Sequence, residues 1–188
     1  FGSGSCMLHS FEKIRRQADI DFDHAIGSPK HWRYWHDFAE KRLFGIEINE
    51  QISRAAKMNM IIHDDGHTNV ITADGLLRDT ELQRVSGNKD FKYNSFDFIL
   101  TNPPFGSSVK QTEKAYLDTY SFGQKDTSWL DLKNSGVKDR GSQSTEVLFI
   151  EQCYQFLKPY GYLAVVLPDG VLTNSSLQYV RDQIEDWY

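Results

Sequence analysis

The residues with the clearest chemical potential form a short turn in the middle of the chain. Residues 96–101 are mostly apolar and predict a β-strand that runs directly into Asn102, Pro103, Pro104 and Phe105. Two adjacent prolines fix φ and remove two backbone N–H donors, so the carbonyl groups of this turn are rigid and only accept hydrogen bonds. Acceptors without donors suit a substrate that carries an amino group.

This turn suits one kind of amine in particular, the exocyclic NH2 of a flat aromatic base. Its lone pair is delocalised into the ring, so the nitrogen becomes a nucleophile only when fixed acceptors hold its two hydrogens. The Asn102 side-chain oxygen and the Pro103 carbonyl are the candidate acceptors. Phe105 offers a face for stacking, which is worth about 1–3 kcal/mol per base in nucleic-acid complexes. The alternative, a plain Pro-Pro loop after a buried strand, explains the prolines but neither the amide nor the aromatic ring.

The turn resembles motif IV of the amino-group DNA methyltransferases, and four further segments resemble other motifs of that family in the same order. They are residues 1–5 for the glycine loop of motif I, 43–49 for motif II, 71–77 for motif III, and 157–170 for a later strand and its flanks. The residues and spacing of these motifs most resemble those of the N6-adenine branch, in particular the modification subunits of type I restriction systems. The resemblance implies a site-specific DNA methyltransferase that moves a methyl group from S-adenosylmethionine to N6 of adenine.

The resemblance also implies where the cofactor binds. Gly2, Ser3 and Gly4 form the loop that lets the backbone approach S-adenosylmethionine closely. Glu47, at the end of the motif II strand, is expected to take both ribose hydroxyl groups, as an acidic residue does in dinucleotide-binding folds. Ile48 is expected to lie against the adenine ring of the cofactor.

The motif III segment is expected to complete this cofactor site. Asp74 accepts from the adenine amine of the cofactor, Gly75 and Leu76 line the same cleft, and Asn102 faces the methyl group. Considered alone, each acidic residue has a simpler interpretation as a solvated strand end or a helix cap. The histidines and aspartates within residues 24–37 and 63–67 lack the spacing of a ligand set, so no metal is expected.

Alternating strand and helix patterns predict an α/β fold. Strands are expected at residues 43–48, 69–73, 96–101 and 162–167, and helices after the glycine loop, after Asn49, at residues 145–157 and near the end. This rhythm implies a mostly parallel sheet with helices on both faces, in keeping with a Rossmann-like S-adenosylmethionine-dependent methyltransferase fold. We expect one domain over residues 1–188 that is truncated at both ends, with a central strand preceding Phe1.

Two segments fall outside this alternation. Residues 17–37 are expected to form an irregular, aromatic and charged insertion. Residues 106–144 are expected to form a long loop after the catalytic turn, with Tyr116, Tyr120, Phe122 and Trp129 in it and several glycines as candidate hinges. This loop is either a lid that closes over a flipped base or a surface loop whose aromatic side chains pack on the domain.

The composition of the chain indicates how it binds its partners and in which compartment. The chain has 188 residues and a net charge of −5, and it lacks the basic face typical of nucleic-acid enzymes, so most of the grip on DNA is expected to lie elsewhere. The family implies double-stranded DNA with a flipped adenine, a specificity subunit or target-recognition domain, and a restriction subunit as a further candidate partner. Cys6 and Cys153 are expected to be buried and unpaired in a reducing, cytoplasmic setting, and no membrane partner is expected.

Other functions remain open at this stage. The same turn serves amino methyltransferases that act on RNA or on a protein glutamine side chain, because a planar amide nitrogen poses the same chemical problem. A different class is a non-catalytic DNA-binding or cofactor-binding subunit. A nicotinamide-binding fold is the third alternative, but the six-residue glycine fingerprint is absent.

Overall fold

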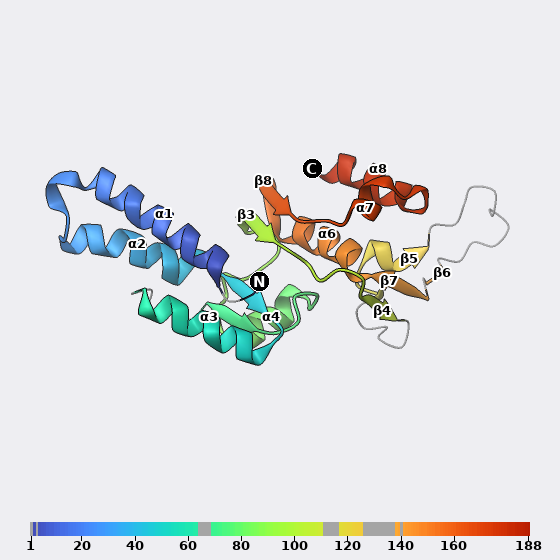
Figure 1. The fold of residues 1–188 in the computed structure, drawn as a ribbon, viewed down its shortest axis with the longest axis horizontal. Helices are drawn as coiled ribbons and strands as arrows, with labels where there is room; N and C mark the ends of the chain where they lie inside the picture. Colours follow the sequence, from blue (N-terminus) through green and yellow to red (C-terminus); the bar gives the residue numbers. More distant parts are fainter. Residues whose placement is uncertain (1, 3, 64–68, 111–116, 126–137, 140) are drawn as a thin grey trace. The chain divides into compact units, whose positions relative to one another are not determined.

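The computed structural model describes residues 2, 4–63, 69–110, 117–125, 138–139 and 141–188, which form two compact units (Figure 1). Unit 1, Phe1–Lys92, contains α1 (Ser5–Asp21), η1 (Asp23–Ala25), α2 (Pro29–Arg42), β1 (Gly45–Glu47), α3 (Glu50–Ile62), β2 (Val70–Thr72) and α4 (Asp79–Ser86). Unit 2, Tyr93–Tyr188, contains β3 (Phe96–Thr101), β4 (Ser108–Lys110), η3 (Ser121–Gly123), β5 (Gln124–Lys125), β6 (Lys138–Asp139), β7 (Ser142–Ser144), α6 (Thr145–Phe156), β8 (Leu157–Val165), α7 (Asp169–Thr173), η5 (Ser175–Leu177) and α8 (Gln178–Trp187).

The sheet of unit 1 is a parallel pair. β1 and β2 run side by side, with Gly45 opposite Val70 and Glu47 opposite Thr72. The Ala73 N–H continues the ladder by donating to the Glu47 carbonyl oxygen at 3.2 Å. Both strands were predicted from sequence and both are shorter than expected. Because parallel strands end at the same edge, the residues that follow β1 and β2 are neighbours.

Most of residues 17–37 belong to two α-helices joined by a short turn, so the prediction of an irregular insertion is wrong. α1 continues to Asp21, and α2 begins at Pro29. Ser28 caps α2 by accepting a hydrogen bond from the His31 N–H, and proline at the first helical position is pre-set for helix geometry. The two helices form a hairpin (Figure 1).

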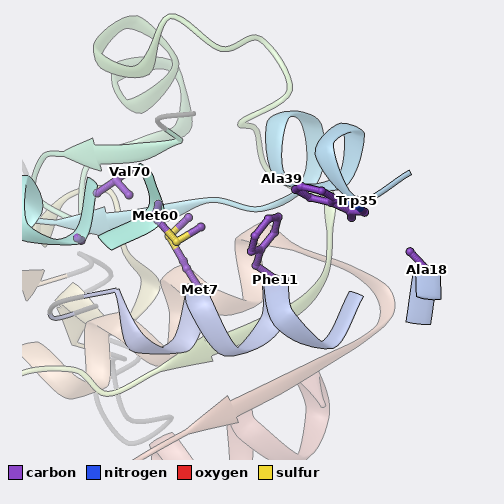
Figure 2. Packing of buried hydrophobic residues seen from close by; sticks show 8 residues of the cluster. Met7, Phe11, Ala18, Trp35, Ala39, Met60 and Val70 are labelled. Atoms are coloured by element: carbon purple, nitrogen blue, oxygen red, sulfur yellow. The ribbon is translucent and has the colours of Figure 1, made fainter. Parts of the chain in front are cut away.

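One apolar cluster joins this hairpin to the rest of unit 1. The helix expected after the glycine loop is α1, and it presents Met7 and Phe11 to the core. Phe11 points toward Trp35 of α2 and Met7 toward Met60 of α3 (Figure 2), and the ring centroids of Phe11 and Trp35 are 5.4 Å apart. Edge-to-face pairs at this distance are favourable. The hairpin is therefore anchored on α3.

The helix predicted after Asn49 is confirmed. The Asn49 side-chain oxygen accepts from the N–H groups of Gln51 and Ile52, at 3.0 and 3.1 Å, and so caps α3. On α3, Ser53 and Met60 are fully buried, whereas Ile52 is 38% exposed.

Unit 2 is built on a second parallel pair. β3 spans the predicted residues and runs beside β8, with Phe98 opposite Tyr162 and Thr101 opposite Val165. β8 begins at Leu157, five residues earlier than expected, because the chain passes directly from α6 into the strand. α6 matches the predicted helix.

The segment that follows β3 was expected to be a long loop, but it contains short antiparallel strand pairs. β4 pairs antiparallel with β7, and β5 with β6. Tyr120 and Phe122 are buried, which favours packing for these two side chains, whereas Tyr116, Trp129 and Gly136 lie outside the described residues. Gly123 is not a hinge: a Cβ there would lie 2.1 Å from the Leu117 carbonyl oxygen, so the glycine is required for close packing.

Of the remaining predictions, some are confirmed and one is wrong. The helix expected near the end is α8, and its Val180 is buried. Both cysteines are free, but Cys153 is buried whereas Cys6 is exposed, so the prediction of burial is wrong for Cys6. Within the described residues, no helix is both long enough and apolar enough to cross a membrane.

Candidate functional site

Glu47 closes the glycine loop onto the end of β1. One carboxylate oxygen accepts the Gly2 N–H at 2.8 Å, and the other accepts the Asn49 N–H at 2.9 Å. Partial burial raises the pKa of the Glu47 carboxyl, but these backbone hydrogen bonds, together with the positive charge of the N-terminal ammonium group, hold its pKa below the ordinary value. A carboxylate has about four lone-pair positions, so both oxygens can still accept from a ribose diol.

Gly4 fixes the start of α1 against α3. Its φ is +90°, in the left-handed region, and a Cβ there would lie 3.2 Å from the Ala56 Cβ. Gly2 also has a positive φ, +73°, but has open space around it. Both glycines therefore meet a backbone requirement, and Gly4 adds a packing requirement. Ser3 lies outside the described residues.

The end of β2 brings a second carboxylate to the same edge. Asp74 is two residues beyond Thr72, which pairs with Glu47. One Asp74 oxygen accepts the Leu76 N–H at 2.9 Å and shapes the turn, while the side chain is half-buried. Leu76 itself is 3% exposed and belongs to the core, whereas Ile48 is 68% exposed. Unit 1 thus presents two carboxylates and an apolar side chain at one sheet edge.

The acceptor turn follows β3 in unit 2. The strand ends in a ladder bond from the Val166 N–H to the Thr101 carbonyl oxygen at 3.1 Å. Asn102 is exposed, and its side chain makes no hydrogen bond with another described residue. Pro103 is buried, and its carbonyl oxygen accepts no hydrogen bond from the described residues. Phe105 is 46% exposed. Among the described residues, the two predicted acceptors therefore have no hydrogen-bond donor, and about half of the Phe105 side chain is exposed.

The structure therefore groups the predicted residues in two sets. Unit 1 brings together Gly2, Gly4, Glu47, Ile48 and the segment 74–76 at the carboxyl edge of β1 and β2. Unit 2 places residues 102–105 at the carboxyl end of β3. Ligands bind at carboxyl ends of parallel strands in open α/β sheets, so both sets occupy the expected position.

Buried polar residues on α6 and β7 were not predicted from sequence. Glu151 is 3% exposed and accepts the N–H groups of Ser121 and Phe122, at 2.6 and 2.9 Å. Gln143 donates to the Phe122 carbonyl oxygen at 2.7 Å and to the Tyr179 hydroxyl at 2.9 Å. Glu146 is 9% exposed, and one of its oxygens has no hydrogen-bond partner among the described residues. The sequence signal that could have identified Glu146 is its spacing, because it lies on the same helix face as the apolar Ile150 and Cys153.

The histidines have local partners. His31 lies 2.8 Å from an Asp19 oxygen, and His36 lies 2.9 Å from the Trp32 carbonyl oxygen. Over the residues that the structure describes, no three histidine, cysteine or acidic side chains are arranged to hold a metal ion. Asp64, Asp65 and His67 lie outside them.

Comparison with known proteins gives a consistent picture. Residues 1–186 match the family described as N-6 DNA Methylase. A curated relative, the type II restriction enzyme and methyltransferase RM.BcgI of Heyndrickxia coagulans, is 29% identical over 125 residues, which are 66% of this chain and 16% of that protein.

A solved structure extends the likeness to the fold. It is the crystal structure of a modification subunit of a putative type I restriction enzyme from Vibrio vulnificus YJ016, and the TM-score is 0.64 at 20% sequence identity. The match covers 98% of this chain and 31% of that one. This chain thus spans less than a third of the length of either protein.

Proposed function

Because this chain belongs to the N-6 DNA methylase family, we propose that its protein transfers a methyl group from S-adenosylmethionine to N6 of adenine in DNA. The observation that carries the proposal is the unengaged turn after β3, where the Asn102 side chain and the Pro103 carbonyl are free to accept. We propose that this protein is the modification component of a restriction-modification system. The family and both relatives favour DNA over RNA or a protein glutamine.

The residues of the acceptor turn act on the base. The Asn102 side-chain oxygen and the Pro103 carbonyl each hold one hydrogen of the amino group, which frees the nitrogen lone pair from the ring. Phe105 stacks on the flipped base and offsets part of the few kcal/mol that flipping costs, at roughly 1–3 kcal/mol per stacked base. Pro103 and Pro104 keep this geometry rigid, so little orientation entropy is lost in the reaction.

The residues of unit 1 fit S-adenosylmethionine. Glu47 holds the ribose hydroxyl groups, Asp74 accepts from the adenine amine with its remaining lone pairs, and the exposed Ile48 side chain covers the adenine ring. Gly2 and Gly4 keep the loop free of side chains, and Gly75 and Leu76 shape the turn beneath Asp74. S-adenosylmethionine supplies the methyl group on a positively charged sulfur, so the protein contributes orientation and electrostatics.

The proposal also covers the assembly and the finer fold. We propose one Rossmann-like domain with a mostly parallel sheet and helices on both faces, which the TM-score of 0.64 supports. A specificity subunit or target-recognition domain supplies most of the DNA-binding surface, because this chain, with a net charge of −5, lacks a basic face. A restriction subunit is a further proposed partner, in a cytoplasmic complex.

The direct test is a transfer assay with tritiated S-adenosylmethionine and the full-length protein. DNA, RNA and a protein extract are offered as separate acceptors, and labelled DNA is digested to nucleosides. We expect label in DNA only, recovered as N6-methyl-2′-deoxyadenosine. Label in RNA, in glutamine or in another base would contradict the proposal, as would the absence of any transfer.

A further inference from the structure

α6 carries two buried glutamates with contrasting surroundings. Both oxygens of Glu151 accept backbone N–H groups, from Ser121 and Phe122. Glu146 is also nine-tenths buried, yet one of its carboxylate oxygens is buried with no hydrogen-bond partner among the described residues. A buried polar atom without a partner costs free energy, so it calls for a reason. Both Glu151 oxygens are satisfied by backbone N–H groups of the fold. For the unpartnered Glu146 oxygen, no described residue provides a donor.

The strand pairing places Glu146 beside the acceptor turn. β4 and β7 are antiparallel, with Ser108 opposite Ser144. The pairing continues past the strand ends, because the Thr145 N–H donates to the Ser107 carbonyl oxygen at 3.1 Å. Glu146 follows Thr145 directly, in the first turn of α6, and Ser107 is only two residues beyond Phe105. The start of α6 is therefore held next to the segment that follows the acceptor turn.

The position of Glu146 favours a negative charge. It lies in the first turn of α6, where the free N–H groups of a helix favour an anion, and Ser144 makes no side-chain cap there. An ionised carboxylate only accepts hydrogen bonds. The missing partner of Glu146 is thus a donor, and a positively charged nitrogen is the strongest kind.

We propose that Glu146 is the counter-ion of the methyl-transfer site, with its free oxygen reserved for a positively charged nitrogen bound there. This rests on the proposed function. Two nitrogens have this chemistry: the α-ammonium group of S-adenosylmethionine, and the base amine in the reaction. When the amine attacks, an N–C bond forms and the C–S bond breaks. The sulfur keeps the electron pair, and the nitrogen carries the positive charge until it loses a proton to water.

The test compares two isosteric variants of the full-length protein, Glu146→Gln and Glu151→Gln. Three quantities are measured: the midpoint of thermal unfolding, S-adenosylmethionine affinity by calorimetry without DNA, and the single-turnover rate of methyl transfer to DNA. Glu146→Gln removes an unpaired buried charge, so its midpoint is expected to equal or exceed that of the wild type. Glu151→Gln breaks satisfied hydrogen bonds, so its midpoint is expected to fall.

The functional readouts distinguish the two nitrogens. A hydrogen bond to a charged group corresponds to about a ten- to hundredfold effect. If Glu146→Gln weakens S-adenosylmethionine binding by that factor, the partner is the cofactor ammonium. If binding is unchanged and the single-turnover rate falls by that factor, the partner is the reacting amine. Either result supports the counter-ion.

Two kinds of result for Glu146→Gln would overturn it, and one result for the wild type would remove its basis. Affinity and rate within about threefold of the wild type would show that the carboxylate has no partner in the reaction. A lower unfolding midpoint with normal activity per folded molecule, or failure to fold, would show that Glu146 is structural. If the wild type methylates DNA and Glu146→Gln does so equally, only this inference fails. If the wild type transfers no methyl group, the proposed function fails and this inference falls with it.

Discussion

Glu151→Gln gives a quantitative prediction for the stability of unit 2. The Glu151 carboxylate is 3% exposed and holds the first two backbone N–H groups of η3, those of Ser121 and Phe122. Gln has nearly the same shape but only one acceptor oxygen. One hydrogen bond is retained, while the other N–H group meets the amide NH2, which is also a donor.

The magnitude follows from the single lost bond. Losing a charge-assisted hydrogen bond and leaving its buried N–H without an acceptor costs about 2–3 kcal/mol. For a chain of this size, each kcal/mol lowers the unfolding midpoint by about 2–4 °C, so we expect a decrease of about 4–12 °C. η3 carries the buried Phe122, whose ring lies 5.1 Å from that of Trp187 on α8. The loss is therefore expected to loosen the α8 contact as well.

The assay is thermal unfolding followed by circular dichroism and tryptophan fluorescence in the full-length protein. Glu185→Gln is the matched control, because Glu185 is exposed on α8 in the same unit and the chemical change is identical. An exposed substitution of this kind is expected to stay within about 0.5 kcal/mol of the wild type. The reasoning is refuted if Glu151→Gln unfolds at the same temperature as Glu185→Gln.

Two further predictions concern the edge of unit 1. Gly4→Ala is expected to lower the unfolding free energy more than Gly2→Ala: both have a positive φ, but only Gly4 also has a close neighbour, the Cβ of Ala56. Equal urea midpoints for the two variants would contradict this. Glu47→Gln is expected to cost about 1 kcal/mol at neutral pH, a value reduced for partial exposure. Because the folded-state pKa of Glu47 is lowered, the stabilisation is present above the unfolded-state pKa and lost as pH falls through the folded-state pKa. Urea titrations at pH 7 and pH 3 check this, and a cost that persists at pH 3 would be inconsistent with the pKa direction.

The sequence predicts those elements whose local signals agree with their packing. β3 was predicted to the residue, because its apolar run ends at a proline pair that cannot continue a strand. The Asn49 cap was predicted because a short acceptor side chain precedes an apolar helix. Glu47 and Asp74 were expected in one cofactor site from the resemblance to motifs II and III, and the parallel pairing of β1 with β2 puts the residues after both strands at one edge.

The errors arise where a local signal has two interpretations. Ser28 and Pro29 lie inside the segment that was expected to be irregular, although this pair starts a helix. Pro159 and Gly161 lie between the expected helix at 145–157 and the strand expected from residue 162, and the structure instead includes both in β8, where Tyr160 has a φ of +66°. Neither case can be decided without the packing partner.

The partnering of buried polar groups could not be predicted either. Glu146 and Glu151 both interrupt an apolar helix, and sequence alone gives them the same status. Their difference depends on η3, which reaches Glu151 from 30 positions earlier in the chain. Such contacts are set by tertiary structure, and the sequence gives no periodic signal for them.

The most direct test of the central claim is Asn102→Ala in the full-length protein, measured for S-adenosylmethionine affinity by calorimetry and for methyl transfer to DNA. The residues assigned to the cofactor ribose and adenine, Glu47 and Asp74, belong to unit 1, so affinity is expected to stay within about threefold of the wild type. Transfer is expected to fall by about a hundredfold or more, because the amine loses one of its two fixed acceptors. Methylation at the wild-type rate would contradict the account.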